Sequence, residues 1–426
     1  MTVLERVSGS LAVGGVPLDR AFAALQRLEP SAHGCYVYDL EQLEGRARRF
    51  RAAFAPLGAF SAFAFKANSL PAILECLRRS GMGGEAGSLG ELELAEAAGF
   101  GPGDRLLNGN GRTLEEAEWV AGHGVHSVNA DHVGELDLLQ RAADREGRTV
   151  RVALRVNPGI VTSGHHYVAT GREDAKFGVA PEEALAAWSA RTRWPALQVD
   201  GVHIHVGSQL LDVGPLEQAV DTALSLADES QHRGAPLSLV NLGGGFGIDY
   251  SGGAGEFPLE DYAGRLARRV EARHGPEWVF EPGRWLTAPV GLLLCEVLWI
   301  KRRGGLRFVV LAAGMNDLLR PALYHARHRI VPVRPRPGPE EPATVVGPVC
   351  ESADVFAEGE PLPPLEPGDL VALLDAGAYG ATMASNYNGR GRLAELVVDR
   401  GRLTRARAGE TPADLAARRR EDVLEV

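Results

Sequence analysis

The chain has 426 residues, 45% of them hydrophobic and 23% charged, and its 45 basic and 55 acidic side chains give a formal net charge of −10. This length is enough to bury two hydrophobic cores, and the composition is that of a soluble globular protein. The negative charge argues against a broad nucleic-acid-binding surface. The longest apolar run, residues 288–300, contains Glu296 and is too short to cross a membrane.

The cysteines and the amino terminus bear on the compartment. The four cysteines stand at scattered positions without paired spacing, namely Cys35, Cys76, Cys295 and Cys350. This pattern predicts neither a disulfide framework nor a metal site. The first residues lack the basic start and apolar run of a signal peptide. We therefore expect a protein of the reducing cytoplasm.

Strand and helix patterns alternate over most of the chain. A strand at Ser10–Val13, a helix at Leu18–Leu28 and a strand at Cys35–Asp39 come first. Eight apolar strands follow, at residues 61–66, 84–88, 105–108, 126–129, 150–157, 202–207, 237–242 and 279–281. Between them lie segments of helical period, including residues 89–98, 114–122, 133–143, 181–191, 213–229 and 259–273. Eight such units in succession predict an α/β fold with a closed parallel (β/α)8 barrel of the TIM type.

The residues after Arg284 follow a different pattern. Two apolar segments, residues 290–301 and 307–311, flank Arg302-Arg303-Gly304-Gly305 and predict a hairpin. A proline-rich loop is expected over 331–342, and strands at 344–346, 370–375 and 395–398, the last turning at Asp399–Gly401. Thr411-Pro-Ala-Asp414 is a helix-start signature for a charged terminal helix. We therefore predict a barrel over 36–284 and a β domain formed by 1–35 and 285–426.

Several predicted strands end in polar residues, and Lys66 is the most unusual of these. It follows the buried pattern of Ser61–Phe65 directly and precedes a helical pattern that begins at Pro71. The carboxyl ends of barrel strands are where ligands bind. A lysine there either extends its ammonium into water or is held for Schiff-base chemistry.

Asn241-Leu-Gly-Gly-Gly-Phe-Gly247 follows another strand. No helical pattern opens at its last glycine, which argues against a dinucleotide fingerprint. Two interpretations remain, a tight structural turn and a nest in which Gly243, Gly244 and Gly245 direct backbone N–H groups at a phosphate.

Two further motifs end barrel strands. His203 and His205 share one face of a strand, and no third ligand at matching spacing indicates a metal. One imidazole could instead stack on a planar ring while Ser208 binds a phosphate. In Glu281-Pro-Gly-Arg284 the carboxylate could pair with a protonated ring nitrogen and the arginine with an oxyanion, or the two could pair with each other.

The β domain carries its own chemical groups. Cys350 stands beside Glu351, Tyr379 lies among small residues, and Arg320 is followed by Tyr324. A lone cysteine is more often a small buried hydrophobe than a catalytic thiol. Taken together with the barrel motifs, however, these groups are the parts that a pyridoxal phosphate enzyme needs.

Seven motifs resemble those of the diaminopimelate decarboxylase family, which has the alanine-racemase-like fold (fold type III) of pyridoxal phosphate enzymes. They are Phe65–Asn68, His203–Gln209, Leu242–Gly247, Glu281–Arg284, Gly314–Tyr324, Gly347–Ser352, and Asp375–Gly380 with Met383–Asn388. The resemblance runs from about Tyr36 to Val398 in the family's order. It is more specific for the fold type than for the substrate.

The resemblance implies a role for each group. Lys66 would carry pyridoxal phosphate as a Schiff base, His205 would stack on its ring, and Glu281 would pair with its ring nitrogen. The phosphate would be held by Ser208, Gly243, Gly244, Gly245 and the Gly283–Arg284 backbone, with Tyr379 beside it. The far end of an amino-acid substrate would contact Arg284, Arg320, Tyr324, Glu351 and Tyr379. Cys350 would donate a proton from the other subunit of a homodimer with shared sites.

Two departures from the family pattern concern the substrate more than the chemistry. Glu85-Ala-Gly-Ser88 replaces the usual Asp-Val-Val-Ser, and Arg390-Gly-Arg-Leu393-Ala-Glu replaces the usual Arg-Pro-Arg-Pro-Ala-Glu. The expected reaction is decarboxylation of meso-diaminopimelate to lysine. The alternatives are a related decarboxylase of another amino acid or of a carrier-linked substrate, a racemase on the same fold, and a non-catalytic pyridoxal phosphate carrier.

Overall fold

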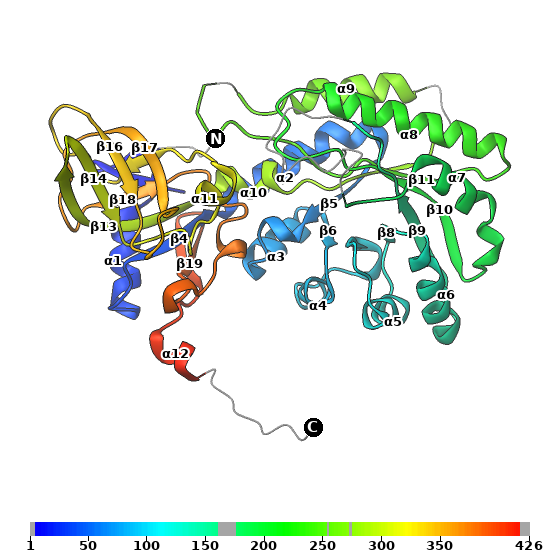
Figure 1. Cartoon of the computed structure of the whole chain (residues 1–426), viewed down its shortest axis with the longest axis horizontal. Coiled ribbons are helices and arrows are strands. Elements are labelled where there is room, and N and C mark those ends of the chain that lie inside the picture. The colour runs from blue at the N-terminus through cyan, green and yellow to red at the C-terminus, as the bar shows by residue number, and fades with distance from the viewer. Residues whose placement is uncertain (1–4, 161–175, 254, 272–274, 418–426) are drawn as a thin grey trace. The chain divides into compact units, whose positions relative to one another are not determined.

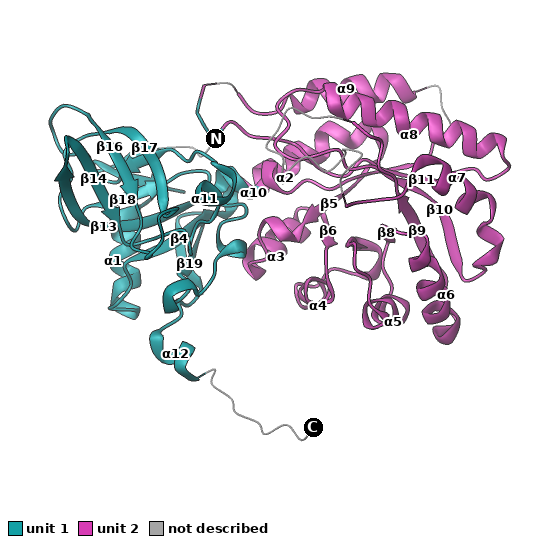
Figure 2. Ribbon diagram, in the orientation of Figure 1, with its two compact units in different colours: residues 1–42, 250–252, 287–426 teal, residues 43–249, 253–286 magenta. Residues whose placement is uncertain are grey.

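The computed structural model describes residues 5–160, 176–253, 255–271 and 275–417. The chain divides into two compact units, coloured separately in Figure 2. The barrel unit comprises Leu43–Asp249 and Gly253–Leu286, and the β unit comprises Met1–Gln42, Tyr250–Gly252 and Thr287–Val426. Residues 36–39, which the sequence analysis assigned to the barrel, lie in a strand of the β unit.

Eight parallel strands close the barrel, which confirms the predicted fold class. The hydrogen-bonded order is β10-β11-β12-β5-β6-β7-β8-β9, and β12 joins β5 through the pairs Val279↔Phe60 and Phe280↔Ser61. In chain order these strands are β5 (Phe60–Ala64), β6 (Gly83–Ala86), β7 (Arg105–Leu107), β8 (Ser127–Ala130), β9 (Val150–Arg155), β10 (Leu197–His203), β11 (Leu239–Asn241) and β12 (Glu277–Phe280).

One helix precedes the first barrel strand and the others follow strands, as Figure 1 shows. They are α2 (Leu40–Phe54), α3 (Pro71–Arg79), α4 (Leu89–Ala97), α5 (Leu114–His123), α6 (Gly134–Glu146), α7 (Pro181–Ser189), α8 (Gly214–His232) and α9 (Leu259–Val270). Local sequence explains where α5 begins, because Thr113 and Glu116 form a reciprocal capping box. The helix predicted over 259–273 ends at Val270, and its predicted last residue lies outside the described residues.

A layer of small and branched side chains fills the barrel interior. Ala62, Leu106, Ala153, Leu239 and Val279 are fully buried there. Eight strands converge on this layer, so it has room for only a few large side chains. A Cβ added at Gly201 would lie 2.7 Å from the Ala153 Cβ, which shows how closely neighbouring strands approach.

The prediction for the strand before His205 was wrong at both ends. A strand was expected over 202–207, whereas β10 runs from Leu197 to His203. Its first half was missed because Gln198 and Asp200 interrupt the apolar pattern. These side chains bond to each other at 2.7 Å, so the strand carries a polar cluster at its amino-terminal end.

The β unit is organised around a long sheet of order β17-β16-β14-β13-β4-β19-β20, and β18 joins β13 to β15. Its strands are β4 (Gly34–Asp39), β13 (Gly291–Arg303), β14 (Leu306–Leu311), β15 (Ile330–Pro332), β16 (Glu341–Val346), β17 (Val355–Leu362), β18 (Leu370–Leu373), β19 (Ala394–Asp399) and β20 (Arg402–Arg407). A smaller sheet contains β1 (Glu5–Val7), β2 (Ser10–Val13) and β3 (Val16–Pro17). The short helices of this unit are α1 (Leu18–Leu28), α11 (Arg320–Tyr324) and α12 (Pro412–Ala417), and α10 (Arg284–Thr287) contains the point in the chain at which the barrel unit ends and the β unit resumes.

The edge strands of the large sheet were not predicted. β17 contains Glu358-Gly359-Glu360, and β20 is rich in arginine, so neither shows an apolar run. Charged edge strands protect a sheet from pairing with other chains, and they therefore look like loops in a sequence. The proline-rich loop expected over 331–342 is also shorter than predicted, because β15 and β16 extend into it at both ends.

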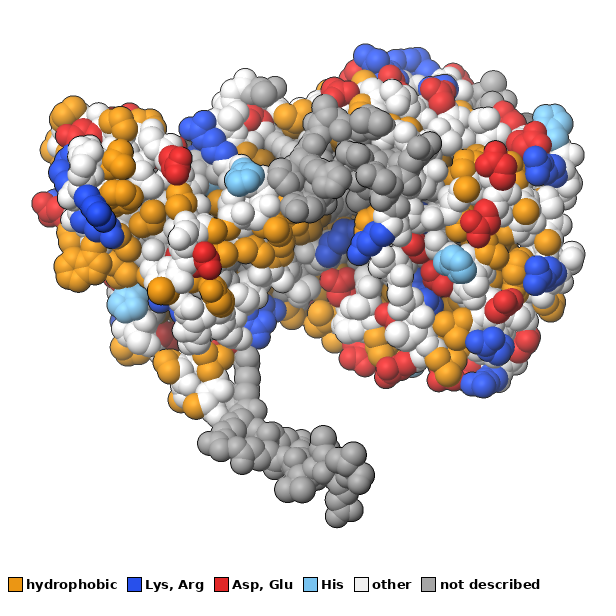
Figure 3. Space-filling view, in the orientation of Figure 1, with side chains coloured by type: hydrophobic (Ala, Val, Ile, Leu, Met, Phe, Trp, Pro, Cys, Tyr) orange, Lys and Arg blue, Asp and Glu red, His pale blue; other side chains and the backbone are white. Residues whose placement is uncertain are grey.

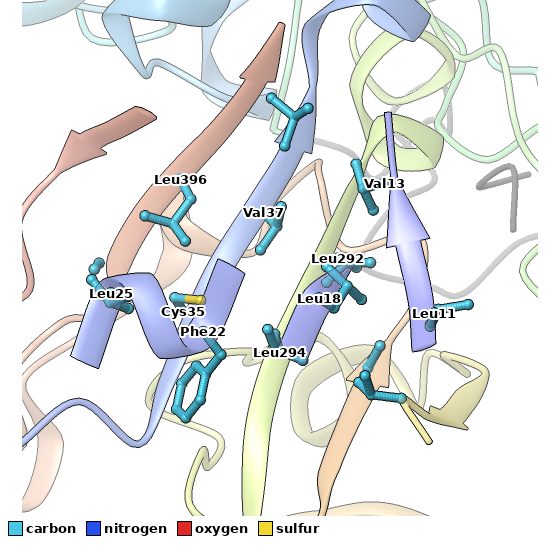
Figure 4. Close-up of a cluster of buried hydrophobic side chains, with 14 of the residues drawn as sticks. Leu11, Val13, Leu18, Phe22, Leu25, Cys35, Val37, Leu292, Leu294 and Leu396 are labelled. Atoms are coloured by element: carbon cyan, nitrogen blue, oxygen red, sulfur yellow. The ribbon is translucent and has the colours of Figure 1, made fainter. Parts of the chain in front are cut away.

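Helix α1 and the large sheet enclose the core shown in Figure 4. Leu18, Phe22 and Leu25 lie on one face of α1, as the helical period requires, and Val37 and Leu292 belong to the neighbouring strands β4 and β13. The predicted bounds of α1 and β2 are confirmed. The buried residues of α1 recur with the helical period, and β2 is a short run in which every residue is buried.

The surface agrees with the composition. On the face drawn in Figure 3, acidic and basic side chains are interspersed over the barrel unit. Within the described ranges, no helix combines the length and the hydrophobicity that crossing a bilayer would need.

An ion-pair network lies at the amino-terminal end of the barrel. Glu277, the first residue of β12, accepts hydrogen bonds from Arg151 at 2.5 Å and pairs with His126 at 2.9 Å. The bond to His126, followed by the bond to Arg151, outweighs desolvation and lowers the pKa of Glu277 to about 2. The ionised carboxylate therefore favours the folded state.

We predict that Glu277→Gln lowers the free energy of unfolding by about 1–2 kcal/mol at pH 7, a range reduced from the full pKa shift because the carboxylate is partly exposed. A lowered folded pKa stabilises the protein above the unfolded pKa and loses this effect as the pH falls toward about 2. The difference between variant and wild type should therefore fall to roughly half at pH 3. Urea unfolding at both pH values measures it, with the exposed Glu93→Gln as control. An equal difference at both pH values would contradict the assignment.

Candidate active site

Lys66 lies at the carboxyl-terminal rim of the barrel, immediately after β5. It occupies a 3-10 turn, Phe65–Ala67, so the strand ends two residues earlier than predicted. Phe65 and Ala67 are buried, whereas the Lys66 side chain is 54% exposed. Asn68 accepts the N–H of Leu70 at 3.0 Å just before α3 begins. The local sequence thus produces a sharp strand–turn–helix that presents the lysine at the rim.

Glu85 is the charged partner of Lys66. It lies in β6 and is 1% exposed, its Oε2 is 3.7 Å from the Lys66 Nζ, and its Oε1 accepts the Asn108 amide at 2.8 Å. Burial raises the pKa of Glu85, and the Lys66 ammonium opposes this rise. The sequence analysis noted Glu85 only as a departure from the family pattern, and the structure shows that it faces the lysine.

Three asparagine amides surround the buried carboxylate of Glu281. Asn108 donates to one oxygen at 3.1 Å, while Asn129 and Asn241 donate to the other at 2.9 and 2.7 Å. The asparagines come from the ends of β7, β8 and β11, and Glu281 follows β12. Burying a carboxylate is costly unless it is hydrogen-bonded, and these neutral donors satisfy Glu281 without cancelling its charge. We refer to these four residues as the amide ring.

The two histidines differ in their surroundings. His203 is fully buried, its Nε2 is 3.7 Å from Glu281, and neither ring nitrogen has a hydrogen-bond partner among the described residues. His205 accepts the N–H of Gly244 through Nδ1 at 3.1 Å, which orients its ring. Desolvation, reinforced by the cations Lys66 and Arg155, lowers the pKa of both imidazoles well below the ordinary value. Both histidines are therefore neutral.

The glycine segment lies against these groups. A Cβ at Gly243 would lie 2.5 Å from the His205 Nδ1, one at Gly244 would lie 2.3 Å from the Glu281 carbonyl, and one at Gly245 would lie 2.8 Å from the Gly207 carbonyl. Gly243 and Gly245 also have positive φ, of 62° and 103°. Both conditions require glycine. The turn therefore has a structural reason for its sequence and also brings backbone close to His205 and Glu281.

Arg284 and Ser208 lie together at the same rim. The Arg284 Nη2 donates to the Ser208 Oγ at 2.9 Å, and the Gly283 carbonyl accepts the N–H of Leu286 at 3.0 Å. The structure therefore brings two of the predicted phosphate-binding residues into contact through the arginine side chain. Among the described residues, the side chains that donate hydrogen bonds to the Glu281 carboxylate are the three asparagines of the amide ring, and Arg284 is not one of them.

The other predicted site residues belong to the β unit. Cys350 is exposed, and its N–H donates to the Asn388 side chain at 2.8 Å. Glu351 accepts a long hydrogen bond from Tyr387 at 3.4 Å. The segment containing Cys350 and Glu351 is thus held by the Met383–Asn388 motif, which the sequence analysis had quoted without giving it a structural role.

Arg320, Tyr324 and Tyr379 complete this set. Arg320 is buried at the start of α11, and Tyr324 ends that helix. Tyr379 has a φ of 56°, which is unusual for a residue with a side chain. Two residues earlier, a Cβ at Gly377 would lie 2.0 Å from the Thr287 carbonyl, so this close backbone approach requires glycine.

Sequence reasoning missed several groups at the rim. Asn129, Asn241 and His203 were not assigned to the buried carboxylate, and Arg155 and Arg112 were not considered. Arg112 has a fully buried side chain and donates to the Asn108 and Asn129 carbonyls at 3.3 and 3.4 Å. The sequence did contain a sign of this cluster, because three different strands each have an asparagine at or beside their end. A closed parallel barrel must bring these three ends to one rim.

Comparison with known proteins agrees with this geometry. Residues 40–288 match the family described as pyridoxal-dependent decarboxylase, pyridoxal binding domain. A diaminopimelate decarboxylase of Zymomonas mobilis is 38% identical over 411 residues, covering 96% of each chain. The crystal structure of a Helicobacter pylori diaminopimelate decarboxylase mutant complexed with L-lysine has a TM-score of 0.87 and 34% identity, covering 92% of this chain and 98% of that one.

A third relative has a similar match over the whole length. The M. jannaschii diaminopimelate decarboxylase in complex with L-lysine has a TM-score of 0.90 and 32% identity, covering 100% of this chain and 99% of that one. The motifs, the barrel and these matches lead to one conclusion. The chain belongs to the diaminopimelate decarboxylase family of pyridoxal-dependent decarboxylases.

Proposed function

We propose that this protein is a pyridoxal phosphate-dependent decarboxylase that converts meso-diaminopimelate to L-lysine and CO2. The observation that carries this proposal is the amide ring, because Asn108 links its buried carboxylate to Glu85, which lies 3.7 Å from the rim lysine on a barrel of this family. A protonated pyridine nitrogen is the partner that such a carboxylate suits.

The residues at the rim fit the cofactor. Lys66 supplies an amine with an exposed side chain, and Glu281 supplies the anion for a ring nitrogen. His205 is a neutral imidazole that can stack on an aromatic ring. The Gly243–Gly245 turn and Ser208 supply small, polar surroundings for a phosphate, and Arg284 adds a cation. The aldehyde, the ring and the phosphate of the cofactor therefore each have a matching group at the rim.

Held at this rim, pyridoxal phosphate would supply an electron sink for the substrate's α-carbon once the substrate amine has taken the place of the Lys66 amine, and this would permit loss of CO2. The chain's own residues have separate tasks. Glu281 would pair with the ring nitrogen and keep it protonated, and the neutral amides around it leave its negative charge available for that purpose. Glu85 lies 3.7 Å from Lys66 and can hold the lysine as an ammonium when its amine is released.

The last step needs a proton donor at the α-carbon. We assign this role to Cys350, whose thiol is exposed and whose backbone is held by Asn388. The family resemblance implies that Cys350 serves the neighbouring subunit, so we propose a homodimer with shared active sites. Because all four cysteines are free thiols, we also propose the reducing cytoplasm as its compartment.

The first prediction for this function concerns Lys66. The chain has three lysines, Lys66, Lys176 and Lys301. The purified holoenzyme should absorb visible light as a protonated imine, and borohydride reduction should fix the cofactor on the Lys66 peptide alone. Lys66→Ala should lose both signals, whereas Lys301→Ala should keep them. Peptide mass spectrometry decides, and a label on Lys176 or Lys301 would refute the assignment.

The second prediction concerns the dimer. Lys66→Ala and Cys350→Ala proteins should each be inactive. After subunit exchange, about a quarter of full activity should return, because half of the dimers are mixed and each mixed dimer has one intact site. Each variant exchanged with itself serves as control. If exchange is demonstrated and activity does not return, Cys350 does not serve the neighbouring subunit.

The third prediction concerns substrate choice. The far end of meso-diaminopimelate carries a carboxylate and an ammonium, which suit the arginines Arg284 and Arg320 and the acid Glu351. Lysine and ornithine lack the far carboxylate and would leave arginine charge uncompensated, so kcat/KM for them should be lower by about a hundredfold or more. Arg320→Lys should lose most of this preference, because a point charge cannot replace a planar fork.

The measurement is CO2 release from meso-diaminopimelate, lysine, ornithine and a carrier-linked glutamyl substrate in parallel. Turnover of another compound with an inert meso-diaminopimelate would leave the cofactor assignment intact and reject the named substrate.

A further inference from the structure

A buried histidine of the β unit has no part in the function described so far. His328 lies between α11 and β15 and is 1% exposed. Its Nδ1 is 2.7 Å from the Leu374 carbonyl oxygen, and its Nε2 is 2.7 Å from the Arg320 Nη1. Both ring nitrogens therefore have short contacts inside the unit.

The chemistry of these partners determines the tautomer. A carbonyl oxygen only accepts hydrogen bonds, so Nδ1 must carry the hydrogen. A guanidinium only donates, so Nε2 must present its lone pair. His328 is therefore a neutral imidazole in one tautomer, fixed at one side by backbone and at the other by the arginine.

The Arg320 guanidinium is held on its face as well as its edge. Its Cζ lies 4.4 Å from the centroid of the Tyr250 ring, and that ring meets His328 edge-on at 5.2 Å. Arg320 itself is only 4% exposed. The contact with the Tyr250 ring fixes the plane of the guanidinium, and the hydrogen bond to His328 fixes its rotation within that plane. The direction of its remaining N–H donors is therefore set.

The hydrogen-bond acceptor of Arg320, the His328 imidazole, is neutral, and this affects the charge around the arginine. A carboxylate at position 328 would also orient the guanidinium, but it would cancel its charge. An imidazole orients the arginine without placing a negative charge against it.

We propose that His328 is a positioning residue that directs Arg320 at the far carboxylate of the substrate while preserving the arginine's charge. This inference rests on the proposed function, since it deepens the role of Arg320. A purely structural role for His328, linking the end of β18 to the segment before β15, is the alternative that the experiment must exclude.

The experiment compares three substitutions in the holoenzyme by CO2 release, with melting temperature recorded for each. His328→Leu removes both hydrogen bonds and should raise KM for meso-diaminopimelate about tenfold, with kcat changed by less than about threefold. His328→Gln can present its oxygen to Arg320 and its amide to Leu374, and should restore KM to within about threefold of wild type. His328→Glu should raise KM at least as much as His328→Leu, because it neutralises the arginine.

Two controls separate positioning from folding. In an Arg320→Lys background, His328→Leu should change KM by less than about twofold, because residues that act as a unit are not additive. For lysine, which lacks the far carboxylate, His328→Leu should leave KM unchanged. The exposed His33→Leu should alter neither constant.

The outcomes distinguish the two levels of inference. If the wild type releases no CO2 from meso-diaminopimelate, the proposed function fails and the role of His328 falls with it. If the wild type is active, three results would each overturn the positioning role alone: His328→Gln as defective as His328→Leu, the same KM effect for lysine, or an undiminished effect in the Arg320→Lys background.

Discussion

A carboxylate can remain charged inside a protein only if hydrogen bonds replace the water that it loses. Glu281 obtains these bonds from three asparagines on three different strands, so the amide ring exists only when the barrel is closed. This requirement links the fold to the chemistry. The parallel order brings the carboxyl ends of β7, β8, β11 and β12 to one rim, and the polar side chains at those ends satisfy one another there.

In the β unit a buried cation, and not an anion, has a neutral group as its hydrogen-bond partner. Arg320 is a buried cation, and a neutral imidazole holds it at 2.7 Å. In both units, a neutral group orients a charged one without adding a charge of the opposite sign. Lys66 and Glu85 differ from these cases, because an acid and a base face each other directly at 3.7 Å and the Lys66 ammonium opposes the rise that burial causes in the pKa of Glu85.

Sequence patterns predicted the barrel, the rim lysine and the glycine turn, because each depends on local features. Lys66 directly follows the apolar sequence pattern of Ser61–Phe65, and Gly243 and Gly245 occupy backbone conformations that favour glycine. The amide ring could not be predicted in the same way. Asn108, Asn129 and Asn241 are ordinary strand-end residues one by one, and only the register of the closed barrel shows that they share one carboxylate. The edge strand β17 was missed for a related reason, since a charged strand resembles a loop until its neighbour β16 is known.

The position of β4 in the large sheet has a consequence for how the chain folds. This strand lies between β13 and β19, although the whole barrel separates it from both in sequence. The barrel can close as soon as β12 has been synthesised, whereas the β4–β19 ladder needs the chain as far as Asp399. At ribosomal rates this leaves an interval on the order of ten seconds. During that time an early apolar strand lacks its later neighbour, which makes the amino-terminal segment the natural site for a chaperone to protect.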